Sequence, residues 1–394
     1  MPDEHRPSPP PSAFGDDRAP AGAGARGGAH RRSVWAKRLR VVGVVGLVVV
    51  LAVSLLQPLR VRAVAAATVA DALDLPVPRP LATTVEVHER PVGGVTGDVY
   101  DPGGDAPAIV LIPGAAPDGR QDERVQRLAR AVAGAGRLVF VPELEVYDQQ
   151  LTTADVDRLV LATRALTDED RGPAVLLGTS FGGALGLLAA ADPRLEGQLA
   201  EVAVFGAYVD LLGVVQAAST GTSLVAGQRL AWEAHPDAEE IVRDRLLELL
   251  DEEERAAVLT VLDGEVEAGE LPGELEAVHA LLTHDDPART YAIAEQLPLS
   301  IRERIAQVSP AAVASRIDTP VVAMHSTDDP AVPYGELVRL GEAIPHARLI
   351  TLESFEHVDL EVESPRDWLQ TGGDLLGAWR FATDVLAAQE RWWP

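Results

Sequence analysis

The chain contains no cysteine. This absence excludes disulfide bonds, thiol catalysis, cysteine-based zinc sites and a lipid-modified N-terminal cysteine. Aromatic residues are also scarce, at 4% of 394 residues, whereas hydrophobic residues as a whole reach 47%. Ala, Val and Leu therefore carry the apolar load, and the chain is long enough to bury one large core or two ordinary ones.

Positive charge is scarce beyond the N-terminus. The net charge is −26, and residues 1–62 carry ten Lys/Arg against four Asp/Glu, so the rest of the chain has a net charge of −32. Such an acidic body repels nucleic acid, which we therefore exclude as a partner. We find no glycine-rich phosphate loop, dinucleotide fingerprint or metal-ligand spacing, and we infer no cofactor and no metal.

One long uncharged run stands near the N-terminus. The sequence "VVGVVGLVVVLAVSLL" covers residues 41–56, and "QPL" extends it to residue 59. This length is sufficient to cross a bilayer as a helix. Five basic residues between Arg31 and Arg40 hold the N-terminus in the cytoplasm. We therefore expect a single-pass anchor in the cell membrane, with the folded body on the extracytoplasmic side.

Two other interpretations of the N-terminus stay open. A cleaved signal peptide would use the small residues Ala63 and Ala65, which flank Val64, and would release a secreted protein. The sequence "RRSVW" is similar to a twin-arginine export signal.

The chain divides by pattern into four parts. Residues 1–40 read as a disordered cytoplasmic tail, 41–59 as the anchor, 60–82 as a linker and 83–394 as the folded domain. From residue 83, β-branched runs alternate with helical stretches, beginning with two runs that flank "GG" and predict an antiparallel pair. This alternation predicts a mostly parallel, doubly wound α/β sheet.

The alternation is lost between residues 210 and 310. This stretch has helical patterning and carries 21 acidic and 7 basic residues, which we interpret as solvated helix faces. We expect it to be a helical lid inserted between two strands of the sheet.

The sequence "AVLLGTSFGGALGLLAA" contains the most informative motif. An apolar strand-like run ends at Gly178, Ser180 follows, and a helical run resumes after Gly182. Small residues two positions on either side of a serine are typical of a nucleophile elbow, where a strained turn raises the hydroxyl above the carboxyl ends of the strands.

With this motif and two regions further along the chain, the sequence resembles the α/β-hydrolase family over about residues 83–390. The resemblance implies the serine–acid–histidine order, with Ser180 as nucleophile. It places the acid at Asp329 in "PVVAMHSTDDPAVP", with Asp328 as the alternative, and the base at His357 in "LITLESFEHVDLE". We interpret His325, at the end of its strand, as a packed core histidine.

The resemblance also implies an oxyanion hole. One donor is the backbone N–H of Phe181, and the other is that of Ala115, with Ala116 as second choice. The chain departs from many members of the family, because Pro113 and Gly114 stand where those members carry His-Gly. The donors are backbone groups, so the triad is unaffected by this change.

These residues together predict a membrane-anchored serine hydrolase that cleaves a small carboxylic ester through an acyl-enzyme intermediate. A thioesterase, acyltransferase or peptidase on the same triad stays open, because the fold does not choose among them. A membrane-tethered binding protein without catalysis is the alternative from another class. The sequence predicts nothing about the oligomeric state.

Overall fold

A computed structural model of the chain describes residues 57–73, 83–114, 118–145, 153–267, 269, 271–353 and 372–389. The chain separates into two compact units, residues 1–57 and residues 58–394, and the description below concerns the second. Residues 41–56 of the expected anchor lie outside the described residues. Among the helices that are described, none is both long enough and apolar enough to cross a bilayer.

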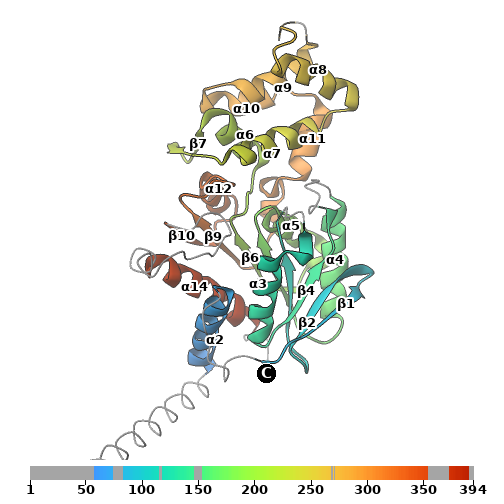
Figure 1. The fold of residues 1–394 in the computed structure, drawn as a ribbon, viewed down its shortest axis with the longest axis vertical. Coiled ribbons are helices and arrows are strands. Elements are labelled where there is room, and N and C mark those ends of the chain that lie inside the picture. Colours follow the sequence, from blue (N-terminus) through green and yellow to red (C-terminus); the bar gives the residue numbers. More distant parts are fainter. Residues whose placement is uncertain are drawn as a thin grey trace, which may run out of the picture. The chain divides into compact units, whose positions relative to one another are not determined.

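An eight-stranded sheet organises this unit (Figure 1). Its strands in chain order are β1 (Glu86–Val92), β2 (Val95–Asp101), β3 (Ala108–Ile112), β4 (Leu138–Pro142), β5 (Ala174–Thr179), β6 (Leu199–Phe205), β9 (Val321–Ser326) and β10 (Arg348–Leu352). Their spatial order is β1-β2-β4-β3-β5-β6-β9-β10. Strand β2 runs antiparallel to both of its neighbours, and the other six strands, β4, β3, β5, β6, β9 and β10, are parallel to one another. The mostly parallel sheet predicted from the alternating pattern is confirmed, and it has the α/β-hydrolase fold.

The first hairpin forms at the expected place. Gly93 and Gly94 join β1 to β2 and have φ angles of 59° and 84°. A residue with a side chain adopts this left-handed region only at a cost, so the glycine pair fixes the turn and the register of both strands.

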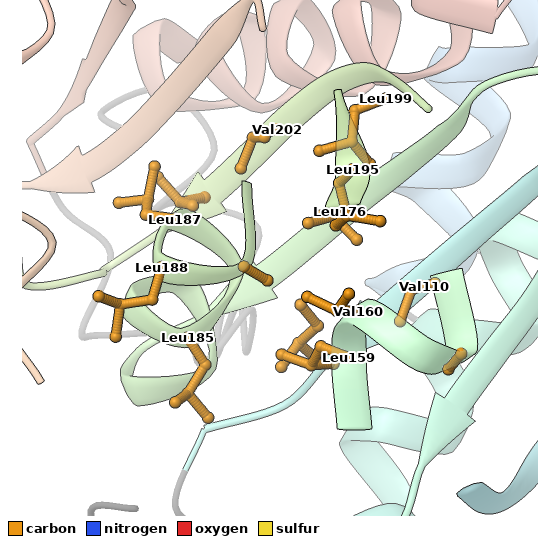
Figure 2. Packing of buried hydrophobic residues seen from close by; sticks show 14 of the residues in the cluster. Val110, Leu159, Val160, Leu176, Leu185, Leu187, Leu188, Leu195, Leu199 and Val202 are labelled. Atoms are coloured by element: carbon orange, nitrogen blue, oxygen red, sulfur yellow. The ribbon is translucent and has the colours of Figure 1, made fainter. Parts of the chain in front are cut away.

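Helices cover both faces of the sheet. They are α3 (Glu123–Gly134), α4 (Ala154–Thr167), α5 (Phe181–Ala190), α12 (Gly335–Ala343) and α14 (Gly372–Ala388). Alternate residues along the central strands point to opposite faces, as the pleat requires. Val110 and Leu176 pack against α4 and α5 (Figure 2), whereas Ile109 and Leu177 belong to the cluster that contains α3 and α14. The central strands are buried on both faces, which explains their continuous apolar sequence.

The segment between β6 and β9 is mainly helical, in agreement with the patterning. Its helices are α6 (Leu211–Thr220), α7 (Pro236–Leu247), α8 (Glu252–Leu262), α9 (Gly273–Thr283), α10 (Thr290–Ala294) and α11 (Leu299–Gln307). These helices share a second apolar cluster, which also includes Ala184 of α5 and Val332 after β9. We call residues 210–310 the insertion.

A two-stranded hairpin in the insertion was not predicted. It pairs β7 (Thr222–Val225) with β8 (Gln228–Ala231) through Ala226 and Gly227, whose φ angles of 50° and 72° suit a tight hairpin turn. The strands are only four residues long, too short for an alternating pattern to stand out from the helical sequence around them.

The helix α2 (Gln57–Ala72) forms from the last three residues of the expected anchor and the first part of the expected linker. Val61 and Ala65 pack against Leu386 of α14, and Trp379 Nε1 donates a hydrogen bond to the carbonyl of Arg62 at 2.9 Å. This contact joins residues more than 300 positions apart in the chain, so local sequence patterning could not indicate it.

Candidate active site

Ser180 occupies a strained turn between β5 and α5. Its φ and ψ angles are 51° and −130°, in a region that favours glycine. The turn is held by backbone hydrogen bonds on both sides, because Ser180 N donates to Phe205 O and Gly183 N donates to Ser180 O, both at 2.9 Å. A non-glycine residue in such a conformation costs about 1–3 kcal/mol and persists only where the surrounding structure enforces it.

The glycines around Ser180 are required by close backbone packing. A Cβ atom on Gly178 would lie 2.5 Å from Gly183 Cα, and a Cβ atom on Gly182 would overlap the carbonyl oxygens of Ile112 and Pro113. The helix α5 can therefore start directly behind the serine only because both positions lack a side chain.

The first amides of α5 lie next to the serine. Phe181 is the first residue of the helix, and the N–H groups of a first helical turn have no partner within the helix. Together with the helix dipole, these groups favour negative charge at this end of α5. The Phe181 ring packs edge-on against Tyr208, with 5.4 Å between the centroids.

A cavity of about 200 Å³ opens beside Ser180, whose side chain is largely buried. Its walls come from the elbow, from the first residues of the insertion, from α7 and from the loop after β9. The lining residues are Ser180, Phe181, Tyr208, Leu211, Val214, Ala238, Ile241, Val242, Arg245, Ala331 and Val332. Burial raises the pKa of Tyr208, so its hydroxyl stays protonated and donates to the carbonyl of Val308 at 2.9 Å.

Asp329 lies in the loop after β9 and is 1% exposed. Its Oδ1 accepts hydrogen bonds from the backbone N–H groups of Ala331 and Val332, each at 2.9 Å. These two residues also line the cavity, so the carboxylate is bonded to the same loop that forms the cavity wall. Asp328, the alternative acid, is exposed.

His325 is buried next to this carboxylate. Its Nε2 lies 3.0 Å from the carbonyl oxygen of Val332 and 3.4 Å from Asp329 Oδ2. A carbonyl oxygen can only accept, so Nε2 carries the proton. His325 is a core histidine that stiffens the loop containing Asp329, in agreement with the interpretation of the sequence.

Two predicted site residues, His357 and Ala115, lie outside the described residues. The residues just before each of these two segments are described. Gly114, just before residues 115–117, lies against Ser180, since a Cβ atom placed on Gly114 would be 2.7 Å from Ser180 Cβ. At the other gap, Leu352 ends β10 beside the loop after β9, and its carbonyl accepts a hydrogen bond from Thr327 N at 2.9 Å.

The insertion contacts the Asp329 loop at two points that sequence analysis missed. Trp232 Nε1 donates to the carbonyl of Asp329 at 2.8 Å, and His235 N donates to the carbonyl of Pro330 at 2.9 Å. Trp232 is buried. Aromatic residues are scarce in this chain, and a tryptophan within the acidic, helical insertion is the one feature of the sequence that could have indicated a structural role for this residue.

A buried carboxyl group holds the start of the insertion. Glu336 of α12 accepts hydrogen bonds from the N–H groups of Val209 and Asp210, both at 2.8 Å, and its Oε1 lies 3.1 Å from Arg339 Nε. Burial, with a further contribution from the negative charge of Asp210, raises the pKa of Glu336 to about 7. Nothing in the local sequence marks this role of the glutamate, because the two backbone N–H groups that it binds lie more than 100 residues away.

Comparison with known proteins gave structural neighbours only. No protein-family model and no curated protein matches the chain. The chain is similar to the 2-hydroxy-6-oxo-6-phenylhexa-2,4-dienoate hydrolase from Rhodococcus sp. strain RHA1, with 18% identity, a TM-score of 0.42, and coverage of 75% of this chain and 100% of the other. It is also similar to a hormone-sensitive lipase from a metagenome library, with 13% identity, a TM-score of 0.44, and coverage of 77% and 84%. The fold assignment rests on the order of the strands, and we take no activity from these neighbours.

Proposed function

We propose that the protein is a serine hydrolase that cleaves a carboxylic ester through an acyl-enzyme intermediate. Ser180 is the nucleophile, His357 the general base and Asp329 the carboxylate that orients the imidazole. The backbone N–H groups of Phe181 and Ala115 form the oxyanion hole. The single observation that carries this proposal is the strained conformation of Ser180 at the edge of a largely apolar cavity.

The chemistry follows from these groups. His357 takes the hydroxyl proton of Ser180 as the oxygen attacks the ester carbonyl, and the tetrahedral oxyanion accepts hydrogen bonds from the two backbone N–H groups. The intermediate collapses to the acyl-enzyme while the imidazolium returns the proton to the departing alcohol. A water molecule, activated by the same imidazole, then releases the acid and restores Ser180.

Burial favours Asp329 over Asp328 as the acid of this triad. A carboxylate that orients an imidazole must itself be fixed, and Asp329 is bonded by two backbone N–H groups. These bonds use Oδ1, while Oδ2 lies on the side of His325. Asp328 is exposed, and within the described part of the chain its carboxylate accepts a single hydrogen bond, from Thr327 Oγ1 at 3.4 Å.

Membrane anchoring through residues 41–59 is the second part of the proposal, with the tail in the cytoplasm and the hydrolase domain outside. The packing of α2 favours an uncleaved anchor over a cleaved signal peptide. The candidate cleavage site at Ala63 to Ala65 lies inside this helix, and Ala65 is fully buried. Carbonate washing of membranes that carry the full chain tests the anchor, and release of the protein into the supernatant contradicts it.

A fluorophosphonate probe tests the nucleophile. Such probes label a serine only where a base activates its hydroxyl. We expect the full chain to be labelled, and Ser180→Ala to lose the label while Ser219→Ala, a partly buried serine of the insertion, keeps it. No labelling of the folded wild-type protein would contradict the proposal and support the binding protein instead.

The base is tested separately by His357→Ala, which is expected to abolish both labelling and ester turnover. Full activity of this variant would show that another group acts as base.

A further inference from the structure

One wall of the cavity is formed by α7. Four residues of this helix line the cavity: Ala238, Ile241, Val242 and Arg245. Their spacing of three, four and seven residues places them on one face of the helix. In an amphipathic helix this face is apolar throughout, yet its fourth position here is an arginine.

Among the described residues that line the cavity, Arg245 alone carries a formal charge. Its side chain is only 12% exposed, and its Nη1 donates to Glu248, one turn along the helix, at 2.6 Å. Glu248 is 38% exposed, so this ion pair reaches from the cavity wall toward solvent. A simple surface pair does not need an arginine that is so deeply buried, because a charge near an apolar cavity costs free energy to desolvate.

We propose that Arg245 binds a carboxylate on the substrate, so that the cavity accepts esters that carry a negative charge at the end remote from the scissile bond. This inference rests on the proposed ester hydrolysis and specifies its substrate class. A guanidinium has five N–H donors in a planar fork that matches a carboxylate, and pairs of this kind are among the stronger hydrogen bonds in proteins. The apolar residues that line the rest of the cavity then contact the carbon chain that joins the two ends.

The size of the cavity limits this chain. Pockets for drug-sized ligands have volumes of about 300–1,000 Å³, whereas this cavity has about 200 Å³. A short acyl group is therefore expected, such as the half-ester of a small dicarboxylic acid.

The strongly acidic character of the protein does not oppose this selection. At about 0.1 M salt the field of exposed charges is screened beyond about 10 Å, whereas a pair within a cavity is screened much less. The net charge of −26 is therefore largely screened from an anion in solution, whereas an anion that reaches Arg245 gains a direct contact that is screened much less.

Two esters that differ only at the remote end test the proposal. Monomethyl glutarate and methyl pentanoate have acyl chains of the same length, which end in a carboxylate and in a methyl group, and methanol release measures the hydrolysis of both. We expect kcat/KM of the full wild-type chain to favour monomethyl glutarate by at least about tenfold, from the strength of a charge-assisted contact. In Arg245→Met this ratio should fall by about tenfold or more, and Arg245→Lys should restore part of it.

Arg243→Met is the matched control. Arg243 belongs to the same helix, is half exposed and does not line this cavity. This variant loses the same charge and should keep the wild-type ratio. If Arg243→Met lowers the ratio as much as Arg245→Met, the effect comes from the general field of the protein, and the proposal is overturned.

Binding separates this inference from the proposed reaction. Ser180→Ala holds either ester without turnover, and ligand-observed NMR measures the affinities with and without Arg245→Met. Selective binding of monomethyl glutarate that depends on Arg245 supports the subsite, even if the wild-type chain cleaves neither ester and the proposed hydrolysis fails. Cleavage of both esters at equal kcat/KM, with binding unchanged by Arg245→Met, overturns the subsite and leaves the hydrolase proposal intact.

Discussion

Replacement of Ser180 by alanine and by glycine measures the strain at the elbow. Both variants lack the hydroxyl, so the comparison isolates the Cβ atom. With φ and ψ at 51° and −130°, a residue with a Cβ atom carries about 1–3 kcal/mol of strain that glycine does not. Glycine lowers the free energy of unfolding by about 0.4–1 kcal/mol, because it gives the unfolded chain more conformational freedom. It lowers it by about 0.8 kcal/mol more, because one buried carbon is missing. The balance of these contributions lies between about 1 kcal/mol against and about 2 kcal/mol in favour of glycine, so we expect Ser180→Gly to be about as stable as Ser180→Ala.

Ala184 supplies the matched reference in the same helix. It is fully buried in the interior of α5, so Ala184→Gly relieves no strain and only loses helix propensity and packing, about 2 kcal/mol in total. Equilibrium unfolding of the full-length wild type and the three variants in guanidinium, followed by far-UV circular dichroism, gives the four free energies of unfolding. If the change from alanine to glycine costs as much at position 180 as at position 184, the elbow is not strained and the main argument for Ser180 as nucleophile fails.

Three further predictions concern the groups around the site. Gly182→Ala inserts a methyl group against two carbonyl oxygens at the end of β3, and should lower the free energy of unfolding by about 1–3 kcal/mol in a denaturant titration. The folded protein binds the Glu336 proton more tightly than the unfolded chain does, because its pKa is raised from 4.5 to about 7. The stabilisation from this group is present below about pH 4.5 and is lost as the pH rises through about 7. Relative to Glu336→Gln, the free energy of unfolding of the wild type in urea should therefore fall by up to about 3 kcal/mol between pH 4.5 and pH 8. Trp232→Phe removes the hydrogen bond to the carbonyl of Asp329, and should lower kcat for ester hydrolysis about tenfold while unfolding stability falls by only about 1 kcal/mol; an unchanged kcat would contradict a positioning role.

Local sequence patterns were sufficient to predict the sheet. The apolar run before Gly114 and the run before Gly178 are buried on both faces, and such strands need no alternation to be recognised. The elbow was equally predictable, because three glycines around Ser180 have few other physical reasons to occur between a strand and a helix. Both features depend on residues within about ten positions of one another.

The features that were missed depend on contacts between distant residues. Trp232 lies 97 residues from the Asp329 carbonyl to which it donates, and Glu336 lies 126 and 127 residues from its backbone donors. The helix α2 forms where the composition suggested a linker, because Val61 and Ala65 find an apolar partner on α14. No periodicity within a short window carries this information, and tertiary packing decides the outcome. The positions of His357 and Ala115 stay predictions.

The insertion is attached to the sheet domain on two sides of the cavity, and this determines how specificity can arise. On one side Glu336 holds the backbone at Val209 and Asp210, where the chain leaves β6. On the other side Trp232 and the N–H of His235 are bonded to the Asp329 loop, and α7 begins at the next residue. A helix that starts from such a fixed point presents its inner face, including Arg245, at a set position relative to Ser180. If the protein is the proposed hydrolase, a change of substrate preference therefore requires only new side chains on the inner face of α7, while the bonds that fix Ser180 and Asp329 stay in place.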